Sequence, residues 1–472
     1  MNFLSSLPSL VIVLNLIFII LLIFFERKDP TTTWAWLLIL TLIPVLGFIL
    51  YLFFGLTPKK HKIYQRKQET DESGQYRKKY FETNFKEQKK TFGHLEQSII
   101  RLGFHNEIPA AIGYNQLKIY SSGQEKFKDL FQDLKEAKDF IHVNYYIIND
   151  DQLGNKFMRI LSQKAAEGLE VRLIYDKIGS KNLSRYSIFN LEDSGAEVAP
   201  FAPFVLDINY RNHRKNVIID GQIGYLGGIN VGDEYLGRSD KFGQWRDTHL
   251  KLEGESVDSL QYRFLLDWNF AAGTNLLEAE KYFPPKKTKG DSALQIISSG
   301  PDSREEEIKA MFLKMIYEAE KKIYIQTPYF IPDQSILEAL KMAARSGVEV
   351  KIMIPDRGDH PFVYAANNSF VGQLLAAGAR CYRYTAGFLH SKTICIDGRV
   401  LSIGTTNMDV RSFKLNFELN AFIYDREKAQ LHDEIFLNDL KKSREITKAE
   451  FESRGWTMKL RESISRLLSP IL

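Results

Sequence analysis

The chain has 472 residues, of which 44% are hydrophobic and 26% are charged, and its formal net charge is +5. The length allows two or three globular domains, and so small a basic excess argues against a dedicated nucleic-acid-binding protein. The two cysteines, Cys381 and Cys395, cannot build a disulfide framework or a zinc site, and their apolar, strand-like surroundings predict buried core thiols.

Two apolar segments open the chain, at residues 7–25 and 34–54. Each is about long enough to cross the roughly 30 Å hydrocarbon layer of a bilayer as a helix. A signal peptide is the alternative for the first segment, but it lacks the positive n-region and cleavage site. A core helix is the alternative for the second. Because the link at 26–33 is short and contains Pro30, we expect a transmembrane hairpin over residues 1–58.

Basic residues favour one orientation of this hairpin. Lysines and arginines cluster just after the second apolar segment, at Lys59, Lys60, Lys62, Arg66 and Lys67. In the link, Arg27 and Lys28 are countered by two acidic residues. The positive-inside rule therefore places the rest of the chain on the cytoplasmic face of a cell membrane, as a multi-pass protein. Residues 59–110 are rich in basic and polar residues and predict a solvated linker.

The remainder of the chain alternates strands and helices in two similar halves. The strand-like run at 140–148 has a counterpart at 322–331, and in each half the order is strand, helix, strand, helix, strand. This order predicts an α/β fold of two lobes, each a mixed β-sheet flanked by helices, packed as a pseudo-dimer. The pattern breaks near 285–295, so we expect lobes at 111–288 and 289–472.

The C-terminal stretch predicts an amphipathic helix. Apolar residues recur there at near-helical spacing with basic residues between them: Trp456, Leu460, Ile464, Leu467 and Leu468 alternate with Lys459, Arg461 and Arg466. Such a helix can lie in a membrane interface. A helix docked on the protein body is an equally good interpretation.

One pattern occurs twice, once in each half. The first copy is His213, Lys215 and Asp220, followed by Gly227, Gly228 and Asn230; the second is His390, Lys392 and Asp397, followed by Gly404, Thr405 and Asn407. Both have the spacing H-x-K-x4-D-x6-G-[GT]-x-N. A single match can arise by chance, but two with the same tail are not expected to. Because each half brings one histidine, we expect the active site between the halves.

Paired histidines suit chemistry at a phosphodiester. A neutral imidazole can attack phosphorus and form a phosphohistidine, while the opposite imidazolium protonates the leaving alcohol and later activates a second one. Lys215 and Lys392 follow their histidines by two residues, so on a strand they share its face and can stabilise charge on the phosphate. Asn230 and Asn407 add neutral donors.

The other motif residues have less direct roles. Asp220 and Asp397 complete the catalytic motifs, but their odd spacing turns them to the opposite face, where we expect bonds to the backbone or a turn. Gly228 lacks a Cβ, which lets the backbone approach a phosphate. Thr405 stands at the equivalent position of the second copy and adds a hydroxyl.

The duplicated motif resembles the phospholipase D superfamily, and the details are most similar to bacterial cardiolipin synthases. Further similarity lies in ERKDPTTTWAW at 26–36, QWRDTH at 244–249, QTPYFIPD at 326–333 and LLSP near the C-terminus. The resemblance covers almost all of the chain and is weakest in the charged stretch around 59–110. It implies an enzyme of the bacterial inner membrane that transfers a phosphatidyl group from one phosphatidylglycerol to another, giving cardiolipin and glycerol through a phosphohistidine.

The resemblance also implies partners for the histidines. It pairs Glu418 with His213 and Asp247 with His390, each carboxylate fixing the tautomer of its imidazole. It makes His213 the nucleophile and His390 the acid and base, roles that the symmetry of the sequence does not assign. Phosphatidylglycerol and membrane lipids are the expected partners. No cofactor or metal is expected, because HExxH, metal-spaced carboxylates and a P-loop are absent from the sequence.

Other functions remain as alternatives. A membrane-bound hydrolase of the same superfamily would use the same residues and release phosphatidic acid. A nuclease is disfavoured by the small basic excess and the membrane tether, and a lipid-binding scaffold by the intact motifs. Tyr329 and Phe330 are interpreted as core residues, His249 as structural, and Asp233 and Glu234 have no assigned role.

Overall fold

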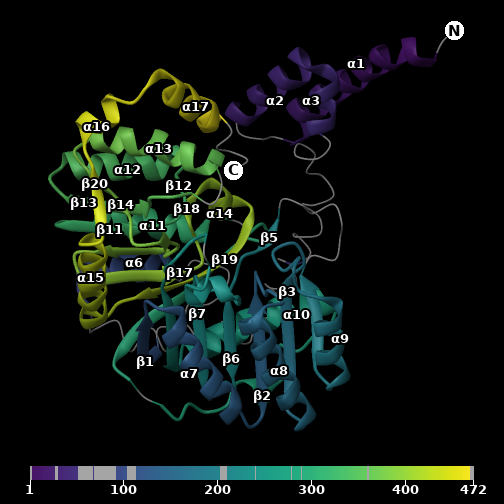
Figure 1. The fold of residues 1–472 in the computed structure, drawn as a ribbon, viewed down its shortest axis with the longest axis vertical. Helices are drawn as coiled ribbons and strands as arrows, with labels where there is room; N and C mark the ends of the chain where they lie inside the picture. The colour runs from purple at the N-terminus through teal and green to yellow at the C-terminus, as the bar shows by residue number, and fades with distance from the viewer. Residues whose placement is uncertain are drawn as a thin grey trace. The chain divides into compact units, whose positions relative to one another are not determined.

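The computed structural model describes most of the chain as two units. The described residues are 3–26, 30–51, 67, 92–103, 113–201, 210–239, 241–277, 279–288, 290–303, 305–358 and 361–467. One unit comprises residues 1–69 with 204–209, and the other comprises 70–203 with 210–472 (Figure 1). Most of the predicted linker at 59–110, and part of the hairpin link at 26–33, lies outside the described residues.

The N-terminal unit is built from packed apolar helices. They are α1 (Phe3–Leu21), continued by the π-helical turn η1 (Leu22–Glu26), then α2 (Pro30–Leu42) and α3 (Pro44–Leu50). Leu22, Leu40 and Tyr51 form their buried contact. Of the helices that the structure describes, none is both long and apolar enough to cross a membrane. The two predicted spans are therefore not confirmed.

Asn15 joins these helices. Its side-chain nitrogen donates to the main-chain oxygens of Leu40, at 3.1 Å, and Pro44, at 3.0 Å. Proline has no N–H, so the carbonyl four residues before Pro44 lacks its usual helical donor, and Asn15 supplies one. The polar side chain thus faces inward, whereas apolar ones face outward: Phe24 is 67% exposed and Leu42 73% exposed.

The larger unit has one continuous mixed sheet, which confirms the predicted α/β class. Its strands in spatial order are β20 (Ser443–Ile446), β14 (Arg380–Tyr384), β13 (Glu349–Pro355), β11 (Lys322–Gln326), β16 (Thr393–Ile396), β17 (Val400–Gly404), β19 (Asn416–Ile423), β10 (Ser292–Ser299), β1 (Gly113–Tyr120), β9 (His249–Gly254), β7 (Ile223–Gly227), β6 (Asn216–Ile219), β2 (Phe140–Tyr145), β3 (Glu170–Asp176) and β4 (Glu197–Phe201). The antiparallel pair β1–β10 lies at the centre. Outward from it, β9-β7-β6-β2-β3-β4 repeats the order β19-β17-β16-β11-β13-β14, so the two halves place their motifs equivalently.

Helices flank this sheet (Figure 1). The first half carries α7 (Gly123–Glu136), α8 (Gln152–Ala166), α9 (Arg185–Asp193) and α10 (Val257–Ala272). With the second half go α6 (His94–Gly103), α11 (Glu307–Glu318), α12 (Gln334–Arg345), α13 (Pro361–Ala376), α14 (Val410–Lys414), α15 (Arg426–Leu440), α16 (Lys448–Glu452) and α17 (Trp456–Leu467). Side chains of Asp151 and Asp333 cap the equivalent helices α8 and α12. Cys381 and Cys395 are buried free thiols, as predicted.

Two short parallel pairings join the halves and position the motif histidines. The strand β5 (Arg211–Asn212) pairs with β19 of the other half, and β15 (Phe388–Leu389) pairs with β8 (Trp245–Arg246). Each pairing continues into the motif histidine that follows it. The N–H of His213 donates to the main-chain oxygen of Phe417, and the N–H of His390 donates to the main-chain oxygen of Arg246. Each histidine is therefore tied to the half that does not contain it.

Candidate active site

Both motif histidines line one pocket between the halves. It has a volume of about 430 Å³, and its wall also includes Asn230, Asn407, Tyr146, Trp245, Arg211 and Arg411. His213 is 8% exposed and His390 is 9% exposed. The ring of Tyr146 lies edge-on to His213 with a centroid distance of 4.9 Å, and Trp245 lies 5.1 Å from His390. The pocket thus presents two imidazoles held by aromatic neighbours.

A carboxylate from the opposite half orients each imidazole. The Nδ1 of His213 lies 3.0 Å from both carboxylate oxygens of Glu418. The Nδ1 of His390 lies 2.6 Å from Oδ2 of Asp247. These are the partners that the family resemblance implied. A proton on each Nδ1 satisfies the carboxylate and leaves Nε2 as the ring nitrogen available to a substrate.

The surroundings favour neutral imidazoles. Burial, followed by the charges of Lys215 and Lys392, holds the pKa of His213 well below its ordinary value. Burial and Lys392 also lower the pKa of His390, to about 4, although Asp247 opposes them. A neutral imidazole has the free electron pair that attack on phosphorus requires.

The two orienting carboxylates differ in charge. Burial raises the pKa of Glu418 to about 7, even though Lys215 acts in the opposite direction. Burial would also raise the pKa of Asp247, but Lys392 and His390 outweigh it and hold that pKa below its ordinary value. At neutral pH Asp247 is therefore ionised, whereas Glu418 is near its midpoint. His390 consequently has the stronger stabilisation for a positive charge.

The motif lysines lie behind the histidines. Both are buried, and neither is among the residues that line the pocket. The Nζ of Lys215 donates to the main-chain oxygen of His213 at 2.6 Å. That of Lys392 donates to the main-chain oxygen of His390 and lies 2.9 Å from its Nδ1. Each ammonium therefore places its charge next to its own histidine, and the expected contact of both lysines with a phosphate stays a prediction.

The motif aspartates close turns. Asp220 and Asp397 have φ angles of 52° and 54°, in the left-handed region, where their hairpins reverse. The Asp220 carboxylate accepts from three consecutive main-chain N–H groups at the start of β2, residues 138–140. Asp397 does the same at residues 320–322. These bonds confirm the expectation that both carboxylates bind the backbone at a turn, while their grouping with the catalytic residues stays a prediction.

Gly228 and Thr405 act on the carboxylates. A Cβ at Gly228 would lie 2.1 Å from Oδ1 of Asp247, so the missing side chain makes room for that carboxylate. At the equivalent position, the hydroxyl of Thr405 donates to Glu418. Both residues therefore position the groups that orient the histidines, and the substrate-binding role expected for them stays a prediction.

Gly228→Ala is expected to reduce turnover about 100-fold, because a misplacement of roughly 1 Å in a catalytic group costs about that much. The Cβ would push the Asp247 carboxylate from Nδ1 of His390. The measurement is a double-mutant cycle with Asp247→Ala, in which Gly228→Ala should add little. Gly455→Ala is the control, because nothing lies within 4 Å of its Cβ position. Additive effects of the two substitutions would contradict this account.

The motif asparagines differ in their contacts. Asn230 is held in place: its Oδ1 accepts from the N–H of Ile147 at 3.2 Å, and its Nδ2 donates to the hydroxyl of Tyr235 at 3.3 Å. The Oδ1 of Asn407 is buried without a hydrogen-bond partner among the described residues. Both side chains line the pocket, so both are placed where a neutral donor can meet a substrate.

Sequence reasoning missed two buried arginines that hold the main chain of the orienting carboxylates. The Nε of Arg214 donates to the main-chain oxygen of Glu418 at 3.1 Å, and its Nη1 contacts both oxygens of Asp267 at 2.7 and 2.8 Å. In the other half, Nη1 of Arg246 donates to the main-chain oxygen of Asp247 at 2.5 Å. Buried guanidinium groups of this kind require such partners. Their positions in the sequence, Arg214 directly after His213 and Arg246 directly before Asp247, could have identified them.

Further pocket residues were also missed or misread. Arg211 stands two residues before His213, a spacing that puts both side chains on one strand face and could have identified it. Tyr329, interpreted as a core residue, lines the pocket, and so does Glu234, which had no assigned role. Arg411 enters from α14, a helix that no motif predicted.

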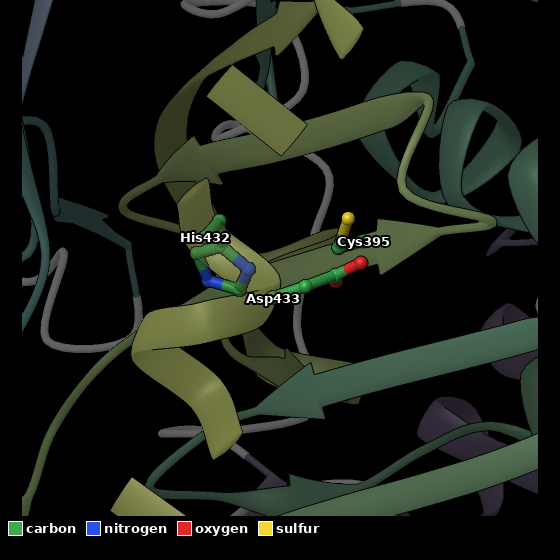
Figure 2. A group of neighbouring side chains, drawn as sticks. All are labelled: Cys395, His432 and Asp433. Carbon is green, nitrogen blue, oxygen red and sulfur yellow. The ribbon is translucent and has the colours of Figure 1, made fainter. Parts of the chain in front are cut away.

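One group of metal-ligand residue types lies away from the pocket wall. Among the described residues, Cys395, His432 and Asp433 place ligand atoms within 4.8 Å of one another (Figure 2). Asp433 forms an ion pair with Lys322 at 2.7 Å. Burial, assisted by Asp433, raises the pKa of the Cys395 thiol well above its usual value. A protonated thiol and a paired carboxylate are poor cation ligands, so no step of the chemistry is assigned to this group.

Comparisons with known proteins agree on one family. A family model described as cardiolipin synthase, PLD-like domain, matches residues 130–243 and 312–440, and one described as phospholipase D-nuclease N-terminal matches 13–55. Cardiolipin synthases of Listeria innocua and Oceanobacillus iheyensis are 45% and 46% identical, with all of both chains covered. One from Staphylococcus aureus is 46% identical over 98% of this chain and 95% of its own. A crystal structure of phosphatidylserine synthase from Haemophilus influenzae has a TM-score of 0.63 over 80% of this chain and all of that one, at 16% identity, and thus shares the fold.

Proposed function

We propose a mechanism for this chain, which belongs to the cardiolipin synthases of the phospholipase D superfamily and is a phosphatidyltransferase. In this mechanism the two substrates are phosphatidylglycerol molecules, and the reaction takes place in the pocket shared by the halves. The observation that carries the proposal is the pair of histidines in one pocket, each with Nδ1 at a carboxylate of the opposite half. This arrangement offers one Nε2 for attack and one for proton transfer.

In the first step, Nε2 of His213 attacks the phosphorus of one phosphatidylglycerol. A P–N bond forms and the bond from phosphorus to the glycerol oxygen breaks. His390, as the imidazolium, gives its Nε2 proton to that oxygen, and free glycerol leaves. The phosphodiester brings a negative charge, which opposes the effect of Lys392 on His390 and favours the imidazolium.

In the second step, a hydroxyl of another phosphatidylglycerol gives its proton to Nε2 of His390. Its oxygen attacks the phosphorus, the P–N bond breaks, and the electron pair returns to His213. The product is cardiolipin, and His390 is again protonated. Dividing the transfer in this way replaces one hard displacement by two easier ones.

The different surroundings of the histidines support this division of roles. The pKa of His213 lies well below its ordinary value, which keeps a nucleophile neutral. His390 faces the carboxylate that stays ionised, and an ionised partner stabilises the imidazolium that an acid needs. The opposite assignment would put the acid beside Glu418, whose pKa is about 7.

The test of function is a product analysis. Purified protein in vesicles of phosphatidylglycerol is expected to release one glycerol for each cardiolipin formed. Phosphatidic acid in place of cardiolipin would instead show that water is the acceptor, as in a hydrolase. The motif variants Asp220→Asn and Asp397→Asn should retain the same product ratio, since those carboxylates accept backbone N–H groups at turns.

We further propose that residues 3–51 associate the protein with the cell membrane as a helical hairpin, with the catalytic halves on the cytoplasmic side. Support comes from their outward apolar side chains, such as Trp34 and Leu42, and the inward Asn15. The basic residues of segment 59–67 support the orientation.

The anchor proposal predicts that the protein stays with membranes after alkaline carbonate washing, because its outward apolar side chains, such as Trp34 and Leu42, leave water when they enter a bilayer. Deletion of residues 1–58 should release it. Labelling of cysteines placed at Thr33 and Lys59 from either side of sealed vesicles checks the orientation. Equal release of the full chain and of the chain without residues 1–58 would contradict the anchor. Labelling of Lys59→Cys from outside intact cells would contradict the orientation.

A further inference from the structure

The C-terminal helix α17 docks on the protein with its polar face. Glu462 is 4% exposed and Ser465 is fully buried, and Glu462 pairs with Arg454 at 2.5–2.6 Å. The helix lies across α13 (Figure 1). An ordinary surface helix buries its apolar side chains and exposes its polar ones. Here that arrangement is reversed, which implies that the exposed apolar side has another neighbour.

The apolar side chains of α17 form one exposed stripe. Trp456 is 74% exposed, Leu460 51%, Ile464 48% and Leu467 80%. At about 100° per residue these four positions fall within an arc of about 80°. The stripe lies on the side of the helix opposite Glu462 and Ser465. Four large apolar side chains gathered on one face are more than the isolated exposed residues that any soluble surface carries.

Charge identifies the kind of neighbour. Lys459 and Arg466 flank the apolar stripe on one side and Arg461 on the other, by the same helical geometry. All three are exposed, and the acidic residue of the helix, Glu462, is turned inward and paired. Basic side chains beside an apolar stripe suit an anionic lipid surface, since the stripe enters the acyl boundary while the cations reach headgroups.

The helix also lies next to the active site. Thr457, Met458 and Arg461 of α17 line a hollow of about 420 Å³ together with Tyr364 of α13. The preceding residue, Val363, lines the catalytic pocket. A membrane in contact with α17 would thus be close to the catalytic pocket that lipid substrates must reach.

From these observations we propose that α17 is a second membrane contact, an interfacial helix that lies on an anionic bilayer through Trp456, Leu460, Ile464 and Leu467. This contact is separate from the N-terminal anchor and from the chemistry. It holds the catalytic halves against the lipid surface, whereas an anchor alone would leave them tethered.

The test uses the full chain in proteoliposomes with an environment-sensitive fluorophore on Leu460→Cys. The native cysteines are both buried, so the introduced one reacts selectively. Glu427→Cys on α15 is the control, because Glu427 has an 85% exposed side chain. Lipids carrying a quencher in the acyl chain should quench the Leu460 label at least threefold more than the control label in vesicles with phosphatidylglycerol. Quenching should weaken in pure phosphatidylcholine and in the variant Arg461→Glu/Arg466→Glu.

Equal quenching at the two positions would overturn the proposal. So would quenching of the Leu460 label that does not depend on vesicle charge, or crosslinking of Leu460→Cys to the N-terminal helices or to a second copy of the chain. The readout needs no turnover, so it remains informative even if the product analysis finds no cardiolipin.

Discussion

His213→Ala is expected to abolish cardiolipin formation, with a loss of at least about 10⁴-fold, as for other enzymes that lose a catalytic nucleophile. Without its Nε2, no P–N bond forms. A substrate with a better leaving group should not restore turnover, because the missing group is the nucleophile. The measurement is release of p-nitrophenol from phosphatidyl-p-nitrophenol, followed by absorbance.

His390→Ala should respond differently to the same substrate. With phosphatidylglycerol its activity is expected to fall about 10²- to 10⁴-fold, the usual contribution of a general acid. With phosphatidyl-p-nitrophenol, whose leaving group needs no proton, it should give a burst of one p-nitrophenol per enzyme. If phosphatidyl-p-nitrophenol restores activity to His213→Ala and gives no burst with His390→Ala, the two roles are the reverse of those proposed. Failure of rescue in both variants would contradict separate roles.

The second large effect is expected from the orienting carboxylates, and it depends on pH. The pKa of Glu418 is raised to about 7 by burial. Its ionised form accepts the Nδ1 proton of His213 and its negative charge stabilises the positive charge that attack on phosphorus places on the ring, whereas the protonated form supplies no such charge. Activity should therefore be present above pH 7 and fall as Glu418 becomes protonated below it. Glu418→Gln removes this titration while keeping an acceptor oxygen. Its pH–activity profile should therefore show no decline near pH 7, and its maximal activity should be lower than that of the unsubstituted protein.

Asp247→Asn is the matched variant in the other half. The pKa of Asp247 is lowered by Lys392 and His390, which outweigh its burial, so it stays ionised throughout this range. The substitution should lower kcat by up to about 10⁴-fold, as the equivalent change does in a serine-protease triad, but leave the position of the acidic decline unchanged. If Glu418→Gln leaves the decline in place, or Asp247→Asn removes it, the assignment of the titrating group is wrong.

Sequence reasoning anticipated the fold class because the two halves repeat their strand and helix pattern, and repetition is visible without coordinates. It did not anticipate that β1 and β10 merge both halves into a single sheet. Pairing between distant strands depends on edges that no local pattern marks. The cross-half pairings at β5 and β8, which place each histidine, are two residues long and leave no sequence signal of their own.

Within the site, spacing placed the histidines and asparagines but did not reveal what the residues around them contact. Alternation on a strand predicts the face of Lys215, yet its flexible stem folds back to the main chain of His213. The reason for Gly228 could not be read from sequence, since the atom that occupies its Cβ space belongs to Asp247, which lies between β8 and β9. The outward face of α17 was undecided for the same reason: burial depends on what the helix packs against.

The most direct test of the two-histidine account is the site of the covalent intermediate. His390→Ala would be mixed with phosphatidyl-p-nitrophenol and stopped in alkaline denaturant, since phosphohistidine is labile in acid, and its peptides would be examined by mass spectrometry. The account predicts a phosphatidyl adduct on His213 and none in the His213→Ala control. An adduct on another residue, or product formation with no adduct on any residue, would contradict it.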